Sequence, residues 1–402
     1  MVMMVQQQIS NQTRLFLTGF AALLVCAFAA SAAGVYLGSA REVIALLPGL
    51  MVMVPPSINM RGSISGVLAS RLSSSMHLGA FDVDFSRESV LGSNLRASFL
   101  TTVIIGFWLG LIVAGICAVF GIEGLGVIDY VVISVVSGIV SGLIVMGITL
   151  VVVLLSYRYG LDLDMIAAPT VTTAGDIVTL PVLVVTTLFF VTLAPGVLHI
   201  LFGIVLILSA ACLVYSVYLD EPVFEINREI LPLLLVLSFI GTLAGLTYTL
   251  DLEKLIAFAV FLIIIPPFTG LCGSIAGILC SRLATGMHMG EIEVKTRPER
   301  VVLEQFGGSY LYALFVFPLI AMIAQGASGL MGIASPGLLE LISVCTISGM
   351  IVITIVNIIA YATAGLSFRY GMDPDNFGIP VITSTIDLVG AGILVAVINI
   401  LI

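Results

Sequence analysis

Two aspartates stand in otherwise apolar stretches of this chain. Asp176 ends the string "RYGLDLDMIAAPTVTTAGD", and Asp387 ends the similar string "RYGMDPDNFGIPVITSTID". Thr172 and Thr383 each come four residues before the aspartate, so each pair shares one face of a helix. Carboxylate and hydroxyl oxygens are ligands that hard cations prefer. The two strings therefore predict oxygen-rich positions at which a hard cation binds.

Prolines, glycines and serines mark a second pair of apolar stretches. We expect each helix to be broken at its prolines, because proline has no N–H for the helical hydrogen bond. Carbonyl groups freed at membrane depth are tolerated where they line protein or a watery pathway. A proline kink used only for packing is the alternative. The residues expected to line the pathway are Pro56, Gly62, Pro267 and Gly273, with Ser63 and Ser274 as further hydroxyl ligands.

The composition places these residues in a membrane protein. Hydrophobic residues make up 60% of the chain and charged residues 9%, with a mean hydropathy of +1.25. Soluble domains contain roughly 25% charged residues, so this chain has too little polar surface to face water. We expect an all-α, polytopic membrane protein whose partner is the lipid bilayer and which does not bind nucleic acid.

Eleven hydrophobic spans can be recognised, each long enough to cross a bilayer. The spans are 14–38, 42–76, 97–121, 127–157, 166–193, 196–219, 229–250, 254–286, 308–328, 336–366 and 377–402.

The basic residues of the loops predict the orientation of these spans. Eleven of the fourteen Lys and Arg residues fall on the side that also holds the N-terminus, and only Arg41 and Lys254 fall on the other. Basic residues collect on the cytoplasmic side of a membrane. We therefore expect a plasma-membrane protein with a cytoplasmic N-terminus and an extracellular C-terminus.

The chain contains an internal repeat with an offset of 211 residues. The segment from Pro55 to Gly79 aligns without a gap with the segment from Pro266 to Gly290, and thirteen of the twenty-five pairs are identical. Five spans are an odd number, so a linking span is needed to keep two repeats parallel. We expect repeats at 1–195 and 225–402 joined by a linking helix at 196–224. Because both halves lie in one chain, we expect it to function as a monomer.

The repeat places both aspartates deep in the membrane. The helix rises roughly 16 Å from about residue 165 to Asp176, and this is about half of a hydrocarbon core about 30 Å thick. An acid at that depth costs about 2.5–3.5 kcal/mol, and Thr179 adds a hydroxyl to the same face. We expect Asp176 and Asp387 to line a central pathway at the repeat interface. The alternative is that each aspartate makes a structural polar contact that holds helices together.

The nature of the ligands favours a hard cation over a soft one. No His/Cys cluster lies at depth, which argues against a soft-metal site. Mg²⁺ keeps several waters and takes one or two carboxylates, and this suits a sparse pair of aspartates. Mn²⁺, Ca²⁺ and Na⁺ stay open. The chain has no Walker motif for coupling to ATP, and transport breaks no covalent bond.

Other charged residues lie at the membrane boundary or at the predicted break. Arg71 and Arg282 end the second spans, where anchoring at the interface is favoured over a role in gating. Acids of the two long loops, Asp82, Asp84, Glu291 and Glu293, are candidates for cytoplasmic ion sensing, with ordinary solvated charge as the favoured alternative. Arg61 falls at the predicted break, where the second repeat has Cys272, and the sequence offers no firm role for it.

Both repeated motifs resemble the MgtE family of Mg²⁺ transporters. The likeness rests on "PPSINMRGSISGVLASRLS" and "RYGLDLDMIAAPTVTTAGD", each present twice, and covers essentially the whole chain. It is closer to the duplicated solute-carrier branch, in which one chain contains both halves. The resemblance implies a divalent cation transporter that is not an enzyme. It also implies that Asp176 and Asp387 are pore aspartates and that the second spans line the pathway.

Two features depart from that family's pattern. Many relatives have Gly-Asn after the predicted break, whereas this chain has Gly62-Ser63 and Gly273-Ser274, so an amide oxygen is missing and the ion selectivity stays open. Only about a dozen residues precede the first span. We therefore expect no soluble regulatory domain of the bacterial type.

Two other functions compete with this interpretation. The first is a secondary transporter of another cation or a small solute, coupled to Na⁺ or H⁺. An intramembrane aspartyl protease also needs two deep aspartates that share a proton. Its GxGD and YD signatures are missing, since the local strings are "TAGD" and "STID".

Overall fold

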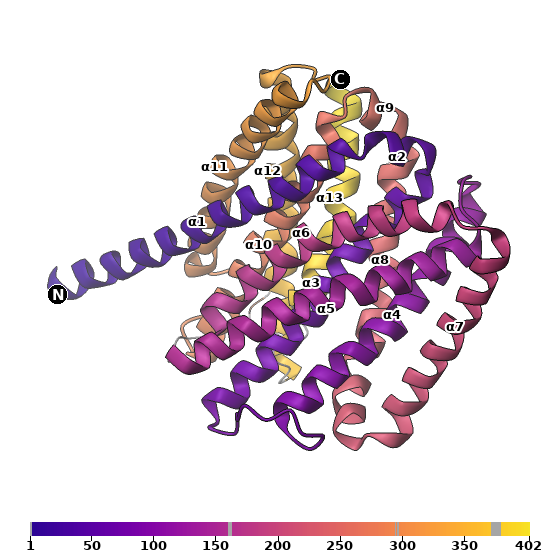
Figure 1. Cartoon of the computed structure of the whole chain (residues 1–402). Helices are drawn as coiled ribbons and strands as arrows, with labels where there is room; N and C mark the ends of the chain where they lie inside the picture. Colours follow the sequence, from indigo (N-terminus) through magenta and orange to yellow (C-terminus); the bar gives the residue numbers. More distant parts are fainter. Residues whose placement is uncertain (1, 160–162, 294, 296, 371–378) are drawn as a thin grey trace. The chain divides into compact units, whose positions relative to one another are not determined.

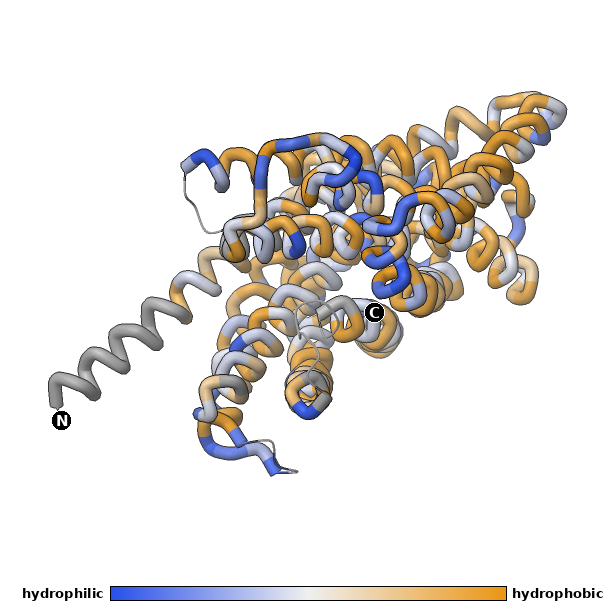
Figure 2. The backbone as a smooth tube through the Cα atoms, turned by 90° about the horizontal axis from the view of Figure 1, so that it is seen from below, coloured by the Kyte–Doolittle hydropathy of each residue, from blue (hydrophilic) through white to orange (hydrophobic). Residues whose placement is uncertain are grey.

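The structure is a computed structural model that describes residues 2–159, 163–293, 295, 297–370 and 379–402. The described residues form helices and no strands (Figure 1), which confirms the all-α fold. Hydrophobic residues run along most of the helices, and hydrophilic residues concentrate in the connecting segments (Figure 2). Ten helices in the described part are long and apolar enough to cross a membrane, against the eleven spans expected. The difference is α3 (Pro48–His77), which has membrane length but is less apolar.

The chain divides into two compact units, which we name after their central helices. The α3 unit comprises Ser39–Ile256, and the α10 unit comprises Met1–Gly38 with Ala257–Ile402. The helices of the α3 unit are α2 (Arg41–Leu46), α3, α4 (Val90–Phe120), α5 (Val127–Tyr159), α6 (Leu163–Val191), α7 (Pro195–Val214), the π-helix η1 (Tyr215–Leu219) and α8 (Glu221–Leu250). The α10 unit contains α1 (Val2–Ser39), α10 (Val260–His288), α11 (Arg300–Met331), α12 (Leu338–Tyr370) and α13 (Ile379–Leu401). The short helix α9 (Leu252–Ala257) spans the boundary.

Helix bounds repeat with the same offset as the sequence. The short helix α2 matches α9, and α5 matches α12, at both ends with a shift of 211 residues. Gly121 and Gly332 end α4 and α11 with φ of 66° and 63°, a left-handed conformation that glycine adopts without strain. The internal repeat is therefore a repeat of helix lengths and helix ends as well as of residues.

The first helix of each repeat belongs to the other repeat's unit. Helix α8 packs along α3 in the α3 unit. Phe16 and Phe20 of α1 stack on Tyr312 of α11 in the α10 unit. The compact units of the structure thus have other bounds than the expected repeats. The repeats at 1–195 and 225–402 are defined by the sequence and stay a prediction. This exchange gives each second helix a neighbour from the opposite half of the chain.

The second helices are continuous at the positions where the prolines predicted a break. Helix α3 passes through Pro55 and Pro56, and α10 passes through Pro266 and Pro267. The chain instead turns before each of them, at Leu47 and near Ala259. The expected break at the prolines is therefore wrong. A helix accepts an internal proline where neighbouring helices accommodate the carbonyl groups that proline leaves unbonded.

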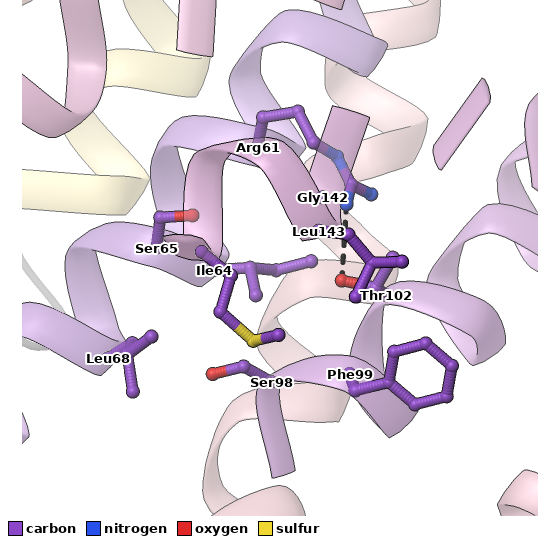
Figure 3. Close-up of a pocket in the computed structure, with 10 residues that line it drawn as sticks. Arg61, Ile64, Ser65, Leu68, Ser98, Phe99, Thr102, Gly142 and Leu143 are labelled. Atoms are coloured by element: carbon purple, nitrogen blue, oxygen red, sulfur yellow. Dashed lines mark hydrogen bonds between the residues drawn. The ribbon is translucent and has the colours of Figure 1, made fainter. Parts of the chain in front are cut away.

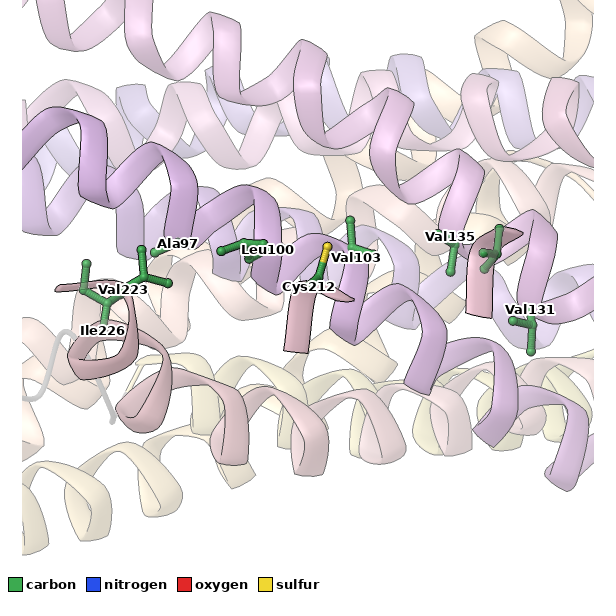
Figure 4. Packing of buried hydrophobic residues seen from close by; sticks show 9 residues of the cluster. Ala97, Leu100, Val103, Val131, Val135, Cys212, Val223 and Ile226 are labelled. Carbon is green, nitrogen blue, oxygen red and sulfur yellow. The ribbon is translucent and has the colours of Figure 1, made fainter. Parts of the chain in front are cut away.

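Apolar side chains from four helices form a core of the α3 unit (Figure 4). Leu100 and Val103 of α4 meet Val131 and Val135 of α5, and Cys212 joins them from α7. Val223 and Ile226 of α8 extend the same cluster. The linking helix α7 and the exchanged helix α8 are therefore held on the α4 side of the unit by ordinary apolar packing.

Candidate cation site

Asp176 lies inside α6, within a stretch apolar enough to span a membrane. Its side chain is buried, with 8% of its surface exposed, and it makes no hydrogen bond or ion pair with the described residues. The hydroxyl of Thr179, one turn later, is also buried and has no partner among them. Buried polar groups are usually hydrogen-bonded, so this face of α6 has oxygen atoms available for a ligand.

Asp387 lies inside α13, also within a candidate membrane span, and is partly buried. Thr383, one turn earlier, faces Gly273 of α10: a Cβ on Gly273 would lie 3.4 Å from the Thr383 Cγ2 atom. The matching contact in the α3 unit joins α6 to α3, since a Cβ on Gly175 would lie 3.7 Å from the backbone nitrogen of Gly62. The fifth helix of each repeat thus packs on the second helix at the predicted glycine. The side chain of Thr172 lies outside the described residues.

The two predicted serines are partly buried, and each donates a hydrogen bond within its own helix. Ser63 Oγ donates to Asn59 Oδ1 at 3.5 Å, and Ser274 Oγ donates to the carbonyl of Gly270 at 2.8 Å. A serine hydroxyl also has two lone pairs. Both oxygens therefore keep the capacity to accept a cation or a water.

Asn59 is a polar residue that the sequence interpretation missed. It lies one turn before Ser63 on α3 and is partly buried. It supplies an amide group near the glycine-serine pair, where the chain lacks the amide that follows this glycine in many relatives. The second repeat has Gly270 at the matching position. The spacing of four residues from Ser63 was the signal that could have found it.

Pro56 and Pro267 contact the exchanged first helices. A Cβ on Gly241 of α8 would lie 3.1 Å from the Cα atom of Pro56, and a Cβ on Gly34 of α1 would lie 3.2 Å from the Cδ atom of Pro267. The structure therefore places these two residues, expected to line the pathway, against α8 and α1.

Arg71 and Arg282 end their helices in contact with polar partners. Arg71 Nε donates to Asn94 Oδ1 at 3.1 Å, and its Nη1 lies 3.6 Å from a Glu229 carboxylate oxygen. Arg282 Nη2 donates to the hydroxyl of Tyr312 at 3.3 Å. Each arginine thus ties its second helix to neighbours in the same unit, and anchoring at the membrane interface stays a prediction.

A family model for divalent cation transporters, MgtE, matches the chain twice, at residues 54–186 and 265–397. The chain belongs to the MgtE family of divalent cation transporters. Each match begins at the second helix of a repeat and ends in the fifth, so it includes the helices that bear the aspartates.

Curated relatives of this MgtE-family chain are solute carriers. Solute carrier family 41 member 2 of Macaca fascicularis is 26% identical over 92% of the chain and 68% of its own length. The Homo sapiens member 2 is 25% identical over the same shares. Member 3 of Mus musculus is 24% identical over 86% of the chain and 74% of its own length. No solved structure matches the chain significantly.

Membership of the MgtE family decides between a transporter and an enzyme. The family consists of transporters, so the chain is not an intramembrane protease or any other enzyme. Its cargo class is a divalent metal cation, and the protein crosses the bilayer several times.

The loop acids proposed for ion sensing are exposed. Asp84 accepts hydrogen bonds from Ser86, and these hold the pKa of its carboxyl below the usual range. A hydrogen bond from Lys295 likewise lowers the pKa of Glu293. Asp82 and Glu291 are exposed as well. In the part of the chain that the structure describes, no three His, Cys, Asp or Glu side chains are grouped as for a metal ion, so the sensing role stays a prediction.

Arg61 finds its partners on the side of α3 that faces α4 and α5 (Figure 3). Its side chain is buried, with 4% exposed, and Nη1 donates to the carbonyl of Gly138 at 3.0 Å and to Thr102 Oγ1 at 3.1 Å. A Cβ on Gly142 would lie 2.5 Å from Nη1, so this glycine leaves the room that the guanidinium occupies. The structure thus supplies the role for Arg61 that the sequence did not.

Proposed function

We propose that this MgtE-family chain transports Mg²⁺ and that Asp176 and Asp387 bind the permeating ion. The observation that carries the proposal is the buried Asp176 carboxylate, which has no hydrogen-bonding partner among the described residues. Thr179 adds an equally unpartnered hydroxyl one turn away. A dehydrating cation needs a fixed negative group where water is scarce, and oxygen ligands of this kind suit Mg²⁺.

The second helix is proposed to supply the remaining oxygens. Ser63 and Ser274 lie beside Gly62 and Gly273, the glycines at which α6 and α13 pack. The 211-residue repeat makes the two halves equivalent, so we place both aspartates on one pathway and one transported ion. We also propose a plasma-membrane location, a cytoplasmic N-terminus, and function as a monomer, because the distribution of basic residues and the fused repeats support them.

Mg²⁺ uptake into proteoliposomes tests this function. Asp176→Asn and Asp387→Asn keep the size of the side chain and remove its charge, so we expect folded protein with strongly reduced Mg²⁺ binding and flux. The double variant should lose little more than either single variant, because losing one carboxylate already impairs a shared site. Asp129→Asn is the matched control, since Asp129 only caps the start of α5 through the amide of Gly126.

If either single variant shows wild-type flux, the aspartates have a role in helix packing and do not bind the transported ion. Opposing Na⁺ and pH gradients in the same assay separate the modes of transport. Flux that follows voltage and ignores both gradients indicates a channel, whereas flux that needs one of them indicates coupled transport.

A further inference from the structure

A small cavity lies between α3, α4 and α5, on the side of α3 where the Arg61 guanidinium makes its hydrogen bonds (Figure 3). Its polar lining consists of Arg61, Ser65, Ser98 and Thr102. The space open to the centres of water molecules is about 10 Å³, which is room for about one water. No part of the proposed cation site requires this cavity.

The charge in this cavity is not balanced by an acid. The Arg61 guanidinium stays protonated in proteins, and none of the carboxylates in the described part of the chain lies within ion-pair distance of it. Both of its hydrogen bonds come from Nη1, and both go to neutral acceptors. Nε and Nη2 are therefore free of protein partners among the described residues. A buried charge without a counter-charge is strongly destabilising.

Polar residues continue from this cavity toward the end of α3. A neighbouring cavity shares Ile64, Leu68 and Ser98 with the first and extends to Arg71. Its other polar lining residues are Asn94, Thr101 and Asn227. Arg71 Nη1 lies 3.6 Å from a carboxylate oxygen of Glu229, whose side chain is mostly exposed. Arg61 thus lines the first cavity and Arg71 lines the second.

The second repeat has apolar residues at three positions of this arrangement and polar residues at two others. Ser309 and Asn357 stand where the first repeat has Ser98 and Met146, and Ser309 Oγ donates to Asn357 Oδ1 at 2.7 Å. Cys272, Ala313 and Ile353 stand where the first repeat has Arg61, Thr102 and Gly142, and all three are buried. The ring of Phe317 lies so close to Gly349 that a Cβ there would overlap it. Since the second repeat has no charged side chain at these positions, packing alone does not require a charge there.

We propose that the cavity beside Arg61 binds a chloride-sized anion. The anion would accept hydrogen bonds from the free guanidinium N–H groups and from the hydroxyls of Ser65, Ser98 or Thr102. It would also neutralise the positive charge of a residue that itself contacts α6, since a Cβ on Gly175 would lie 3.7 Å from the Arg61 Cβ atom. This site goes beyond the proposed cation function and does not depend on it.

Halide binding to the purified full-length protein tests the proposal. Saturable broadening of the ³⁵Cl resonance, competed by bromide, should be seen with the wild type. Bromide anomalous density in crystals should lie beside Arg61. Arg61→Met should weaken halide binding by about tenfold or more. Arg282→Met, which removes an arginine from the other repeat, is the matched control and should bind like the wild type.

A second variant keeps the proposal testable if Arg61→Met does not fold. The triple variant R61C/T102A/G142I installs the residues that the second repeat uses at these positions. It should fold and bind no halide. Absence of saturable halide binding in folded wild type, or unchanged binding in either Arg61 variant, would overturn the proposal. Mg²⁺ flux is measured separately, so failure of the cation function would leave this result standing.

Discussion

Gly245 of α8 lies directly against the backbone carbonyl of Val52 on α3. A Cβ at residue 245 would overlap that oxygen. The carbonyl of Val52 is the one that Pro56, four residues later, cannot bond because it has no N–H. The α10 unit repeats the relationship, since a Cβ on Gly34 of α1 would overlap the carbonyl oxygen of Ile263, four residues before Pro267. In both units, the first helix of one repeat meets the second helix of the other where a proline has freed a carbonyl.

This relationship predicts that side chains at Gly245 and Gly34 destabilise the protein. Gly245→Val and Gly34→Val should each lower the free energy of unfolding by about 1–3 kcal/mol or more, because backbone atoms cannot yield as side chains do. Gly147→Ala is the control: no heavy atom of the described structure lies within 4 Å of a Cβ there. Thermal unfolding in detergent measures the difference. Equal stability of Gly245→Val and wild type would show that the close approach is absent.

The Asp220 carboxylate predicts a pH-dependent contribution to stability. Its side chain is 1% exposed and accepts hydrogen bonds from Arg96 Nε at 2.9 Å and from the hydroxyl of Tyr215 at 3.1 Å. Burial by itself would raise the pKa of Asp220, but these hydrogen bonds outweigh it and lower the pKa below 3.8. A carboxyl with a lowered pKa stabilises the fold above its unfolded pKa and loses that effect as the pH falls through the folded value.

Asp220→Asn should therefore cost about 1–3 kcal/mol of unfolding free energy near neutral pH. The difference in the free energy of unfolding between variant and wild type should disappear as the pH falls from about 5 to about 3. Unfolding at a series of pH values measures it. Glu221→Gln changes the neighbouring exposed acid and should have little effect. A gap that stays constant over this range would contradict the role given to the Asp220 charge.

Asn59 is predicted to contribute an oxygen to cation binding, if the proposed function holds. Asn59→Ala should weaken Mg²⁺ binding several-fold, or about 1 kcal/mol, while Asn59→Asp should retain it because an oxygen stays in place. Mg²⁺ titration of both purified variants distinguishes them. Identical affinity of Asn59→Ala and wild type would remove Asn59 from the site.

The exposed loop acids are predicted to leave transport unchanged. One variant combines Asp82→Asn, Asp84→Asn, Glu291→Gln and Glu293→Gln. Its flux should depend as in the wild type on the Mg²⁺ concentration on the side of the membrane that these loops face. The physical reason is that exposed, solvated carboxylates hold a divalent cation weakly unless several converge. Proteoliposome flux at graded Mg²⁺ checks this. A shifted dependence would show that the loops sense the ion.

The sequence alone determined the membrane class, the repeat and the two aspartates. A bilayer admits long apolar helices and penalises any other backbone, so hydropathy recognises most of the spans. Helix α3 is long enough to span but less apolar. The shift of 211 residues is a property of the chain itself, and it singled out Asp176 and Asp387 because few acids tolerate such surroundings.

Only the tertiary structure decided which helix packs on which and what the buried polar residues contact. Each first helix packs in the unit of the other repeat, and this depends on contacts between residues far apart in the chain, such as Gly245 and Val52. The prolines predicted a break, but neighbouring glycines let the helix continue through them. Arg61 was ambiguous for the same reason: its partners, Gly138 and Thr102, come from two other helices, and local spacing carries no information about such contacts.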